Sequence, residues 1–221
     1  MTPREAKTPN GPLHRIGRAP EPLAWAEWRY VGEGRFDPTK RPASLRVLYV
    51  AEQRLACFVE TLAKWRPRLD LLARLGALPT GDVRDERLRD AAGMIPNTWH
   101  LDRRMATLRL LAGQRWLDLR EHQTRETLRL RLARRLRSLG YADFELGDAM
   151  GRDRRLTKSI AQFAVTEGFQ GIAYKSRFDH AFDCWALFEG AEFRQLADEP
   201  IAPDDPDLIE AARRLGLRLE P

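Results

Sequence analysis

Residues 46–65, RVLYVAEQRLACFVETLAKW, predict a short strand that runs directly into a helix. The run at 46–52 is apolar and contains β-branched and aromatic side chains, which is typical of a strand. The segment at 53–65 changes to helical spacing, and Pro67 marks the end of that helix or a kink in it. The apolar positions that recur at helical spacing are Leu55, Phe58, Val59 and Leu62.

Further elements are predicted on the C-terminal side of this pair. Two strands are expected at 171–176 and 184–190, joined by a connection longer than a tight hairpin turn. Helices are expected at 102–112, 124–139 and 154–167, and the last two are each followed by a glycine that favours a helix end. Weaker patterns predict a strand at 115–121 and helices at 69–75 and 207–215.

This irregular succession of strands and helices predicts an α+β fold, with flanking helices around a small, mostly antiparallel sheet. Residues 1–13 contain three prolines and no periodic pattern, so we expect a flexible N-terminal arm there. The main domain is placed at 14–197, with an expanded helical segment at about 66–150. The remainder, 198–221, is predicted to be an acidic, proline-rich tail with one short helix.

The composition limits the classes of protein to which the chain can belong. The chain has 221 residues, of which 43% are hydrophobic, so it can bury a core. Its net charge of +6 is concentrated in 102–155, where the arginines are spread around helices as on a solvated face rather than a nucleic-acid surface. No apolar run suits a membrane span or a secretion signal. Cys57 and Cys184 have apolar neighbours, which predicts buried thiols in a reducing cytoplasm.

Motif searches exclude several common chemistries. The sequence contains no GxGxxG, no phosphate-binding loop ending in Gly-Lys-Ser/Thr and no HExxH. The histidines show no ligand spacing, so we expect no metal site, and zinc enzymes and serine hydrolases are disfavoured. The four histidines are His14, His100, His122 and His180.

Five polar residues stand in otherwise apolar surroundings, at places from which a side chain can face a pocket. Tyr49 lies in the middle of a strand, and Glu60 falls at the margin of the apolar stripe of the next helix. Arg35 follows a Gly-Glu-Gly run, Arg15 lies in HRIGR, and Ser176 ends a strand. The residues alone leave ordinary roles open: a packed tyrosine ring, a surface glutamate and solvated arginines.

Short stretches in a fixed order resemble the RES domain family, which is named for its recurring arginine, glutamate and serine. The resemblance runs over about residues 13–193, nearly the whole chain. The stretches are LHRIGRAP at 13–20, GRFDP at 34–38, VLYVAE at 47–52, ACFVE at 56–60, EGFQGIAYKSRFD at 167–179 and CWALFE at 184–189.

The resemblance implies a fold similar to ADP-ribosyltransferases and diphtheria-type toxins. It implies the toxin of a bacterial toxin–antitoxin pair, neutralised by an antitoxin protein with an Xre-like helix-turn-helix region. Members of the family degrade NAD+ by hydrolysis or phosphorolysis of the nicotinamide–ribose bond. NAD+ is then a substrate rather than a cofactor, inorganic phosphate is a candidate co-substrate, and no metal is required.

By motif match, the resemblance implies catalytic roles for Glu60, Arg35 and Tyr49, and substrate-binding roles for Arg15, Arg35, Tyr49 and Ser176. Breaking an N-glycosidic bond builds positive charge on the ribose, which a fixed carboxylate such as Glu60 stabilises. The Tyr49 ring suits the flat, cationic nicotinamide, and the arginines suit the diphosphate. The Ser176 hydroxyl is expected to hydrogen-bond the ribose or the carboxamide.

Two other functions remain open from the sequence. One is an ADP-ribosyltransferase that passes the ribosyl group to a protein or small-molecule acceptor. The other is a binding module for nucleic acid or protein, built on the arginine-rich helices. The expanded segment at 66–150 is compatible with a lid, an oligomer contact or an antitoxin-binding surface, and the helix at 207–215 with packing on its own domain or on a second copy.

Overall fold

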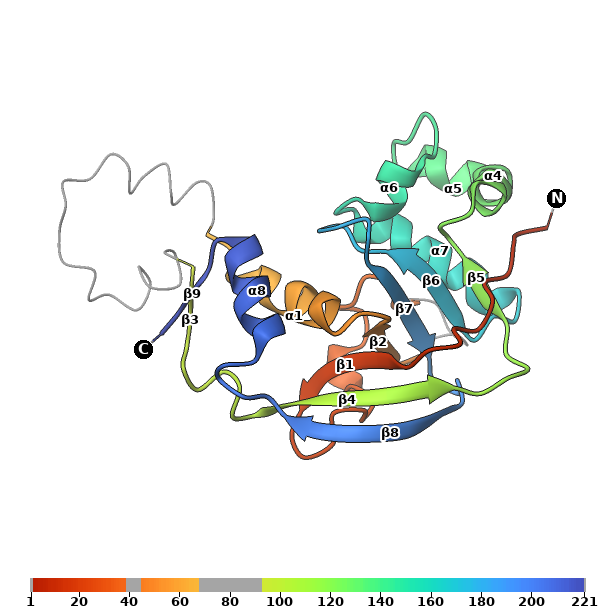
Figure 1. Ribbon diagram of the computed structural model, residues 1–221. Coiled ribbons are helices and arrows are strands. Elements are labelled where there is room, and N and C mark those ends of the chain that lie inside the picture. The colour runs from red at the N-terminus through yellow and green to blue at the C-terminus, as the bar shows by residue number, and fades with distance from the viewer. Residues whose placement is uncertain (1, 39–44, 68–92, 221) are drawn as a thin grey trace, which may run out of the picture.

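The computed structural model describes residues 2–38, 45–67 and 93–220, and within these ranges seven strands form one sheet (Figure 1). The strands are β1 (Leu13–Arg18), β2 (Val47–Ala51), β4 (Arg103–Leu110), β5 (Trp116–Asp118), β6 (Gly171–Lys175), β7 (Asp183–Phe188) and β8 (Phe193–Pro200). Their order is β5-β6-β7-β2-β1-β4-β8, and β5–β6 is the parallel pair among otherwise antiparallel neighbours. The predicted α+β class with a mostly antiparallel sheet is confirmed.

The helices gather in two groups. Figure 1 shows α1 and α8 side by side near β1 and β2, whereas α4 to α7 lie at the β5–β6 end of the sheet. The short strands β3 (Met94–Ile95) and β9 (Arg218–Leu219) pair in parallel apart from the main sheet. The helices are η1 (Trp28–Tyr30), α1 (Arg54–Leu62), η2 (Ala63–Trp65), α4 (His122–Arg131), α5 (Ala133–Ser138), α6 (Leu146–Met150), α7 (Arg154–Thr166) and α8 (Pro206–Leu215).

The sheet is apolar on both faces, which explains why β2 is an unbroken apolar run rather than an alternating one. Leu48 and Val50 face one core, which also contains Trp116 and Trp185, with ring centroids 5.8 Å apart at 89°. The alternate positions of β2 face the core beneath the helices, and Tyr49 packs at its edge. The period of two along the strand therefore directs Tyr49 toward the helix side, where α1 lies.

Elements with a strong local pattern agree with the sequence predictions. The strand expected at 46–52 is β2, and the helix at 53–65 is α1 followed by η2. The helix at 154–167 is α7, and the strands at 171–176 and 184–190 are β6 and β7. The short strand at 115–121 is β5, and the C-terminal helix is α8, which ends at Gly216 with a left-handed φ of 67°. The helix predicted at 69–75 lies outside the described residues.

The helix predicted at 102–112 is wrong, because this segment forms strand β4. Met, Leu and Arg are good helix formers, so intrinsic propensity favoured a helix. The burial pattern instead has a period of two, with Ala106, Leu108 and Leu110 on one face. Pairing with β1 on one side and β8 on the other decides the outcome, and β1 and β8 themselves were not predicted. The helix expected at 124–139 is interrupted at Leu132 into α4 and α5.

Both chain ends pack on the domain. In the segment expected to be a flexible arm, the Ala6 N–H donates to the Trp116 carbonyl at 2.8 Å, and the Asp118 N–H donates to the Arg4 carbonyl at 3.1 Å. The boundary placed at 197/198 falls within β8. Helix α8 packs on α1 of its own domain, where Arg54 forms an ion pair with Asp205 at 2.7 Å. None of the helices in the described ranges combines the length and apolarity needed to cross a bilayer.

Asp153→Ala is expected to destabilise the fold by about 1 kcal/mol, because Asp153 caps α7 by accepting the Arg155 N–H at 2.9 Å. Hydrogen bonds from Arg155 lower the pKa of the Asp153 carboxyl to about 2. The stabilisation is therefore full above the carboxyl's ordinary pKa and disappears as the pH falls toward about 2. Urea unfolding measures the loss, and the exposed Asp204→Ala serves as a control that leaves stability nearly unchanged. Equal stability of the two variants would refute the cap.

Candidate functional site

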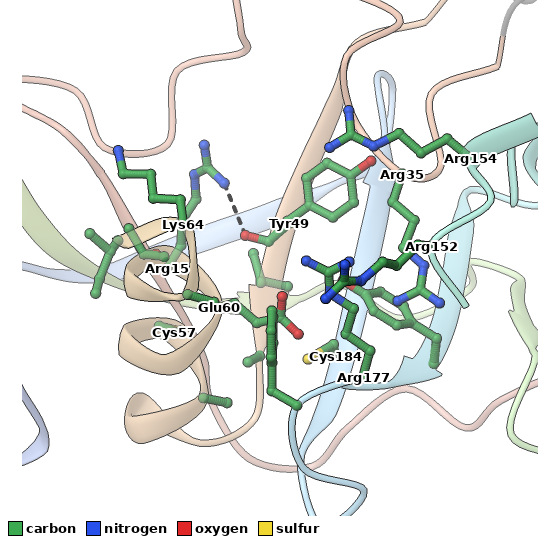
Figure 2. A pocket seen from close by; sticks show the side chains of 18 of the residues that line it. Arg15, Arg35, Tyr49, Cys57, Glu60, Lys64, Arg152, Arg154, Arg177 and Cys184 are labelled. Carbon is green, nitrogen blue, oxygen red and sulfur yellow. Dashed lines mark hydrogen bonds between the residues drawn. The ribbon is translucent and has the colours of Figure 1, made fainter. Parts of the chain in front are cut away.

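A cavity of about 400 Å³ opens between α1, β2 and the loop that precedes α7. Figure 2 shows side chains from all three converging on it. Of the five residues that the sequence singled out, Arg15, Arg35, Tyr49 and Glu60 line the cavity. The fifth, Ser176, touches Glu60 from behind. The structure thus brings together residues that are up to 161 positions apart in the chain.

Glu60 carries the single carboxylate among the described residues that line this cavity. It projects from α1 on the same wall as Ala56 and Ala63, whose small side chains leave the space in front of it open. The fully buried Ser176 hydroxyl donates to Glu60 Oε1 at 2.6 Å and accepts the Phe178 N–H at 3.1 Å. Because its proton is engaged, Ser176 is placed to orient Glu60 rather than to donate to the ribose or the carboxamide.

Tyr49 presents its ring to the cavity while its hydroxyl is anchored away from it. The hydroxyl accepts the Phe36 N–H at 2.8 Å and donates to Asp37 Oδ1 at 3.0 Å. Burial raises the pKa of the Tyr49 phenol well above its ordinary value, and the neighbouring Asp37 charge raises it further. The phenol is therefore neutral at physiological pH and contributes an aromatic face, not a base.

Arg35 lies deep in the cavity against the Tyr174 ring, 5.7 Å from its centroid. Its Nη2 donates to the Ala149 carbonyl, and the Thr157 hydroxyl donates to the Arg35 carbonyl at 2.6 Å. Burial lowers the pKa of the Arg35 guanidinium, and the nearby Tyr174 and Glu60 oppose that shift, so the group stays charged. Within the described part of the chain, the buried Arg35 Nε has no hydrogen-bond acceptor.

Arg15 lies where the neighbouring strands β1 and β2 begin to separate. Strands β1 and β2 share the single residue pair His14↔Ala51. Beyond that pair, the Arg15 side chain donates from Nη1 to the Tyr49 carbonyl at 3.0 Å, as the dashed line in Figure 2 shows, and from Nε to the Pro22 carbonyl at 2.9 Å. Arg15 therefore holds the two strands where they separate, and its side chain forms part of the cavity lining.

Four further cations line the cavity that sequence reasoning did not assign to it. They come from η2, from the loop before α7 and the first residue of α7, and from the β6–β7 connection, so no single stretch of sequence reveals the cluster. The sequence signals for this cluster are the run GRDRR at 151–155, where α7 begins, and the arginine that follows Ser176. With Arg15 and Arg35 they make six cations against one carboxylate in the cavity lining, which predicts an anionic ligand. The four residues are Lys64, Arg152, Arg154 and Arg177.

The family model for the RES domain matches residues 12–208, almost the entire chain. The chain belongs to the RES domain family. A chain of the crystal structure of the M. tuberculosis MbcT–MbcA toxin–antitoxin complex has a similar fold, with a TM-score of 0.57 and 14% sequence identity over 96% of this chain and 92% of that one. A search of the curated proteins finds no matching sequence. The observed sheet is compatible with the ADP-ribosyltransferase-like architecture that the resemblance implied.

The two cysteines of this RES domain line the same cavity, and both are buried free thiols as predicted. Burial raises the pKa of the Cys57 thiol to about 12 and that of Cys184 well above its ordinary value. Both thiols are therefore protonated near neutral pH. A protonated, buried thiol is a poor nucleophile, so the reactive group of the site is not a cysteine.

The arginine-rich helices of the RES domain are engaged in local contacts. Arg129 pairs with Asp143, Arg131 pairs with Glu167 at 2.7 Å, and Arg125 donates to main-chain carbonyls. These ion pairs and main-chain hydrogen bonds engage much of the positive charge along α4. They favour a solvated helix face over a nucleic-acid surface, as the sequence predicted.

Proposed function

We propose that this RES domain is the toxin of a toxin–antitoxin pair and that it cleaves the nicotinamide–ribose bond of NAD+. The observation that carries the proposal is the Glu60 carboxylate, which is held by Ser176 at 2.6 Å in a cavity whose lining also includes six cationic side chains. A dinucleotide presents the complementary features, which are a sugar that becomes cationic and a diphosphate that is anionic. The family membership and the similarity to a toxin–antitoxin complex support the toxin assignment.

In the proposed reaction the bond between ribose C1″ and the nicotinamide nitrogen breaks, and its electron pair leaves with neutral nicotinamide. The ribose ring becomes an oxocarbenium-like cation at the transition state. Glu60 stabilises this charge from a fixed position, which is effective because little reorganisation is required as the charge forms. Water or phosphate then forms the new bond to C1″, and Glu60 accepts or orients the proton that water releases.

In this proposal, cations of the cavity lining bind the diphosphate of the substrate. Figure 2 shows Arg15 and Lys64 on one side of Glu60, with Arg35 and Arg152 on the other. Guanidinium groups bind phosphate oxygens through paired, charge-assisted hydrogen bonds. Arg35 is a candidate for such a contact, because its guanidinium lies in the cavity lining. Tyr49 supplies the ring against which the cationic nicotinamide stacks before the bond breaks.

To test the proposal, NAD+ is incubated with the purified, folded chain free of antitoxin, and proton NMR detects released nicotinamide. We expect release of nicotinamide, with ADP-ribose formed in phosphate-free buffer or ADP-ribose 1″-phosphate formed when phosphate is present. ADP-ribose attached to an added protein acceptor would instead support the transferase. Absence of nicotinamide release both with and without phosphate would contradict the proposal.

A separate experiment tests the antitoxin partner. We expect an Xre-like antitoxin encoded beside the gene to co-purify with the chain, and its binding to abolish activity.

Ser176→Ala is expected to lower kcat for nicotinamide release by about 10- to 100-fold, because Glu60 loses a charge-assisted hydrogen bond that fixes it. KM for NAD+ should change much less, since Ser176 does not line the cavity. Steady-state kinetics measure both constants. The exposed Ser138→Ala is the matched control and should behave like the wild type. A Ser176→Ala variant with unchanged kcat would show that Glu60 needs no such support.

A further inference from the structure

Asp37 is a buried carboxylate at the back of the cavity, 6% exposed, and it does not line the cavity itself. Its Oδ2 accepts the Gly32 N–H at 2.9 Å and the Gly34 N–H at 2.7 Å. Its Oδ1 accepts the Tyr49 hydroxyl proton at 3.0 Å. One side chain thus joins the turn that carries Arg35 to the strand that carries Tyr49.

The turn leaves little space around this junction. A side chain at Gly34 would bring Cβ to 2.5 Å from the Tyr49 hydroxyl and into the Asp37 carboxylate. Such a contact is far closer than packed atoms allow, so the glycine permits the close approach. The Phe36 N–H also donates to the Tyr49 hydroxyl, which closes a loop of bonds between the turn and the strand.

The same turn is held from its other side by α7. Lys158 donates to the Gly32 carbonyl, Arg154 donates to the Glu33 carbonyl, and the Thr157 hydroxyl donates to the Arg35 carbonyl. The carbonyls of the turn therefore face α7. Its amides at positions 32 and 34 face Asp37. Asp37 completes the backbone hydrogen bonding of a segment that would otherwise bury unsatisfied donors.

We propose that Asp37 is a positioning residue for the reaction, acting through Arg35 and Tyr49 without touching the substrate. This inference rests on the proposed function of the cavity. One carboxylate oxygen fixes the turn that presents the Arg35 guanidinium to the diphosphate. The other fixes the Tyr49 hydroxyl, and with it the ring plane that the nicotinamide meets. A carboxylate is required because all three partners are donors.

Two substitutions separate these actions. In Asp37→Asn the amide oxygen still accepts from Gly32 and Gly34, while the amide nitrogen replaces the acceptor that Tyr49 needs. This variant should lower kcat by about 10-fold with little change in KM, and combining it with Tyr49→Phe should add less than about threefold. Asp37→Ala also frees the turn and should raise KM for NAD+ by about 10- to 100-fold. Full additivity with Tyr49→Phe, or a KM for Asp37→Ala equal to that of the wild type, would overturn the proposal.

Amide hydrogen exchange followed by NMR gives a readout that does not depend on turnover. Asp37→Ala should increase exchange at the Gly32 and Gly34 amides, and Tyr49→Phe should increase it at the Phe36 amide. The control Asp205→Asn, a buried helix cap outside the cavity, should leave these amides protected. If the wild type fails to cleave NAD+, the proposed function fails, and exchange alone then decides the role of Asp37. Unchanged exchange in Asp37→Ala would overturn that role.

Discussion

Glu60→Gln is expected to lower kcat for nicotinamide release by about 100- to 1,000-fold, while the Kd for NAD+ changes by less than about threefold. Glutamine keeps the shape of the side chain and can still accept the Ser176 hydroxyl through its amide oxygen. It removes the negative charge that stabilises the ribose cation, and that charge matters most at the transition state. Single-turnover kinetics measure the chemical step, and isothermal titration calorimetry measures binding.

A matched control for this substitution is Glu167→Gln, which removes a carboxylate that pairs with Arg131 outside the cavity. It should retain wild-type kcat. Equal losses in kcat and affinity for Glu60→Gln would mean that Glu60 acts in the ground state as a binding residue. Retention of full kcat would remove Glu60 from the mechanism altogether.

Arg35→Lys is expected to raise KM for NAD+ by about 10- to 100-fold, even though the positive charge is kept. Lysine lacks the planar, forked set of N–H donors that a guanidinium presents to phosphate oxygens, and Arg35 lines the cavity. An ammonium also loses the planar contact with the Tyr174 ring, 5.7 Å from its centroid. Initial-rate kinetics over a range of NAD+ concentrations measure the effect.

The control for Arg35→Lys is Arg129→Lys on α4, where the arginine pairs with Asp143 outside the cavity. It should leave KM unchanged. A wild-type KM for Arg35→Lys would show that the diphosphate is held by other cations. The start of α7 and the loop before it would then be the place to examine, through Arg152→Ala and Arg154→Ala.

Local pattern was sufficient for the elements whose packing follows directly from their sequence. Helix α1 buries an apolar stripe at helical spacing, and α7 ends just before Gly168, the glycine that was expected to end it. Strand β4 was mistaken for a helix because its alternation is short and its residues favour helices. The sequences of β1 and β8 show little alternation of apolar and polar residues. These strands form because each pairs with one edge of β4.

The candidate site was predictable to the extent that single residues matched family motifs. Arg15, Arg35, Tyr49 and Glu60 do share one cavity, as that match required. Asp37 was missed, because its three hydrogen bonds join a turn and a strand that only the fold brings together. The additional arginines were missed for a related reason, since a basic residue in a charged stretch resembles a solvated one until the chain folds.

The most direct test of the account is a crystal structure of the Glu60→Gln variant with NAD+ bound. The account predicts that the nicotinamide ribose lies against residue 60, with its ring on Tyr49 and its diphosphate on Arg15 and Arg35. A dinucleotide bound outside this cavity, or one whose ribose faces away from residue 60, would contradict it.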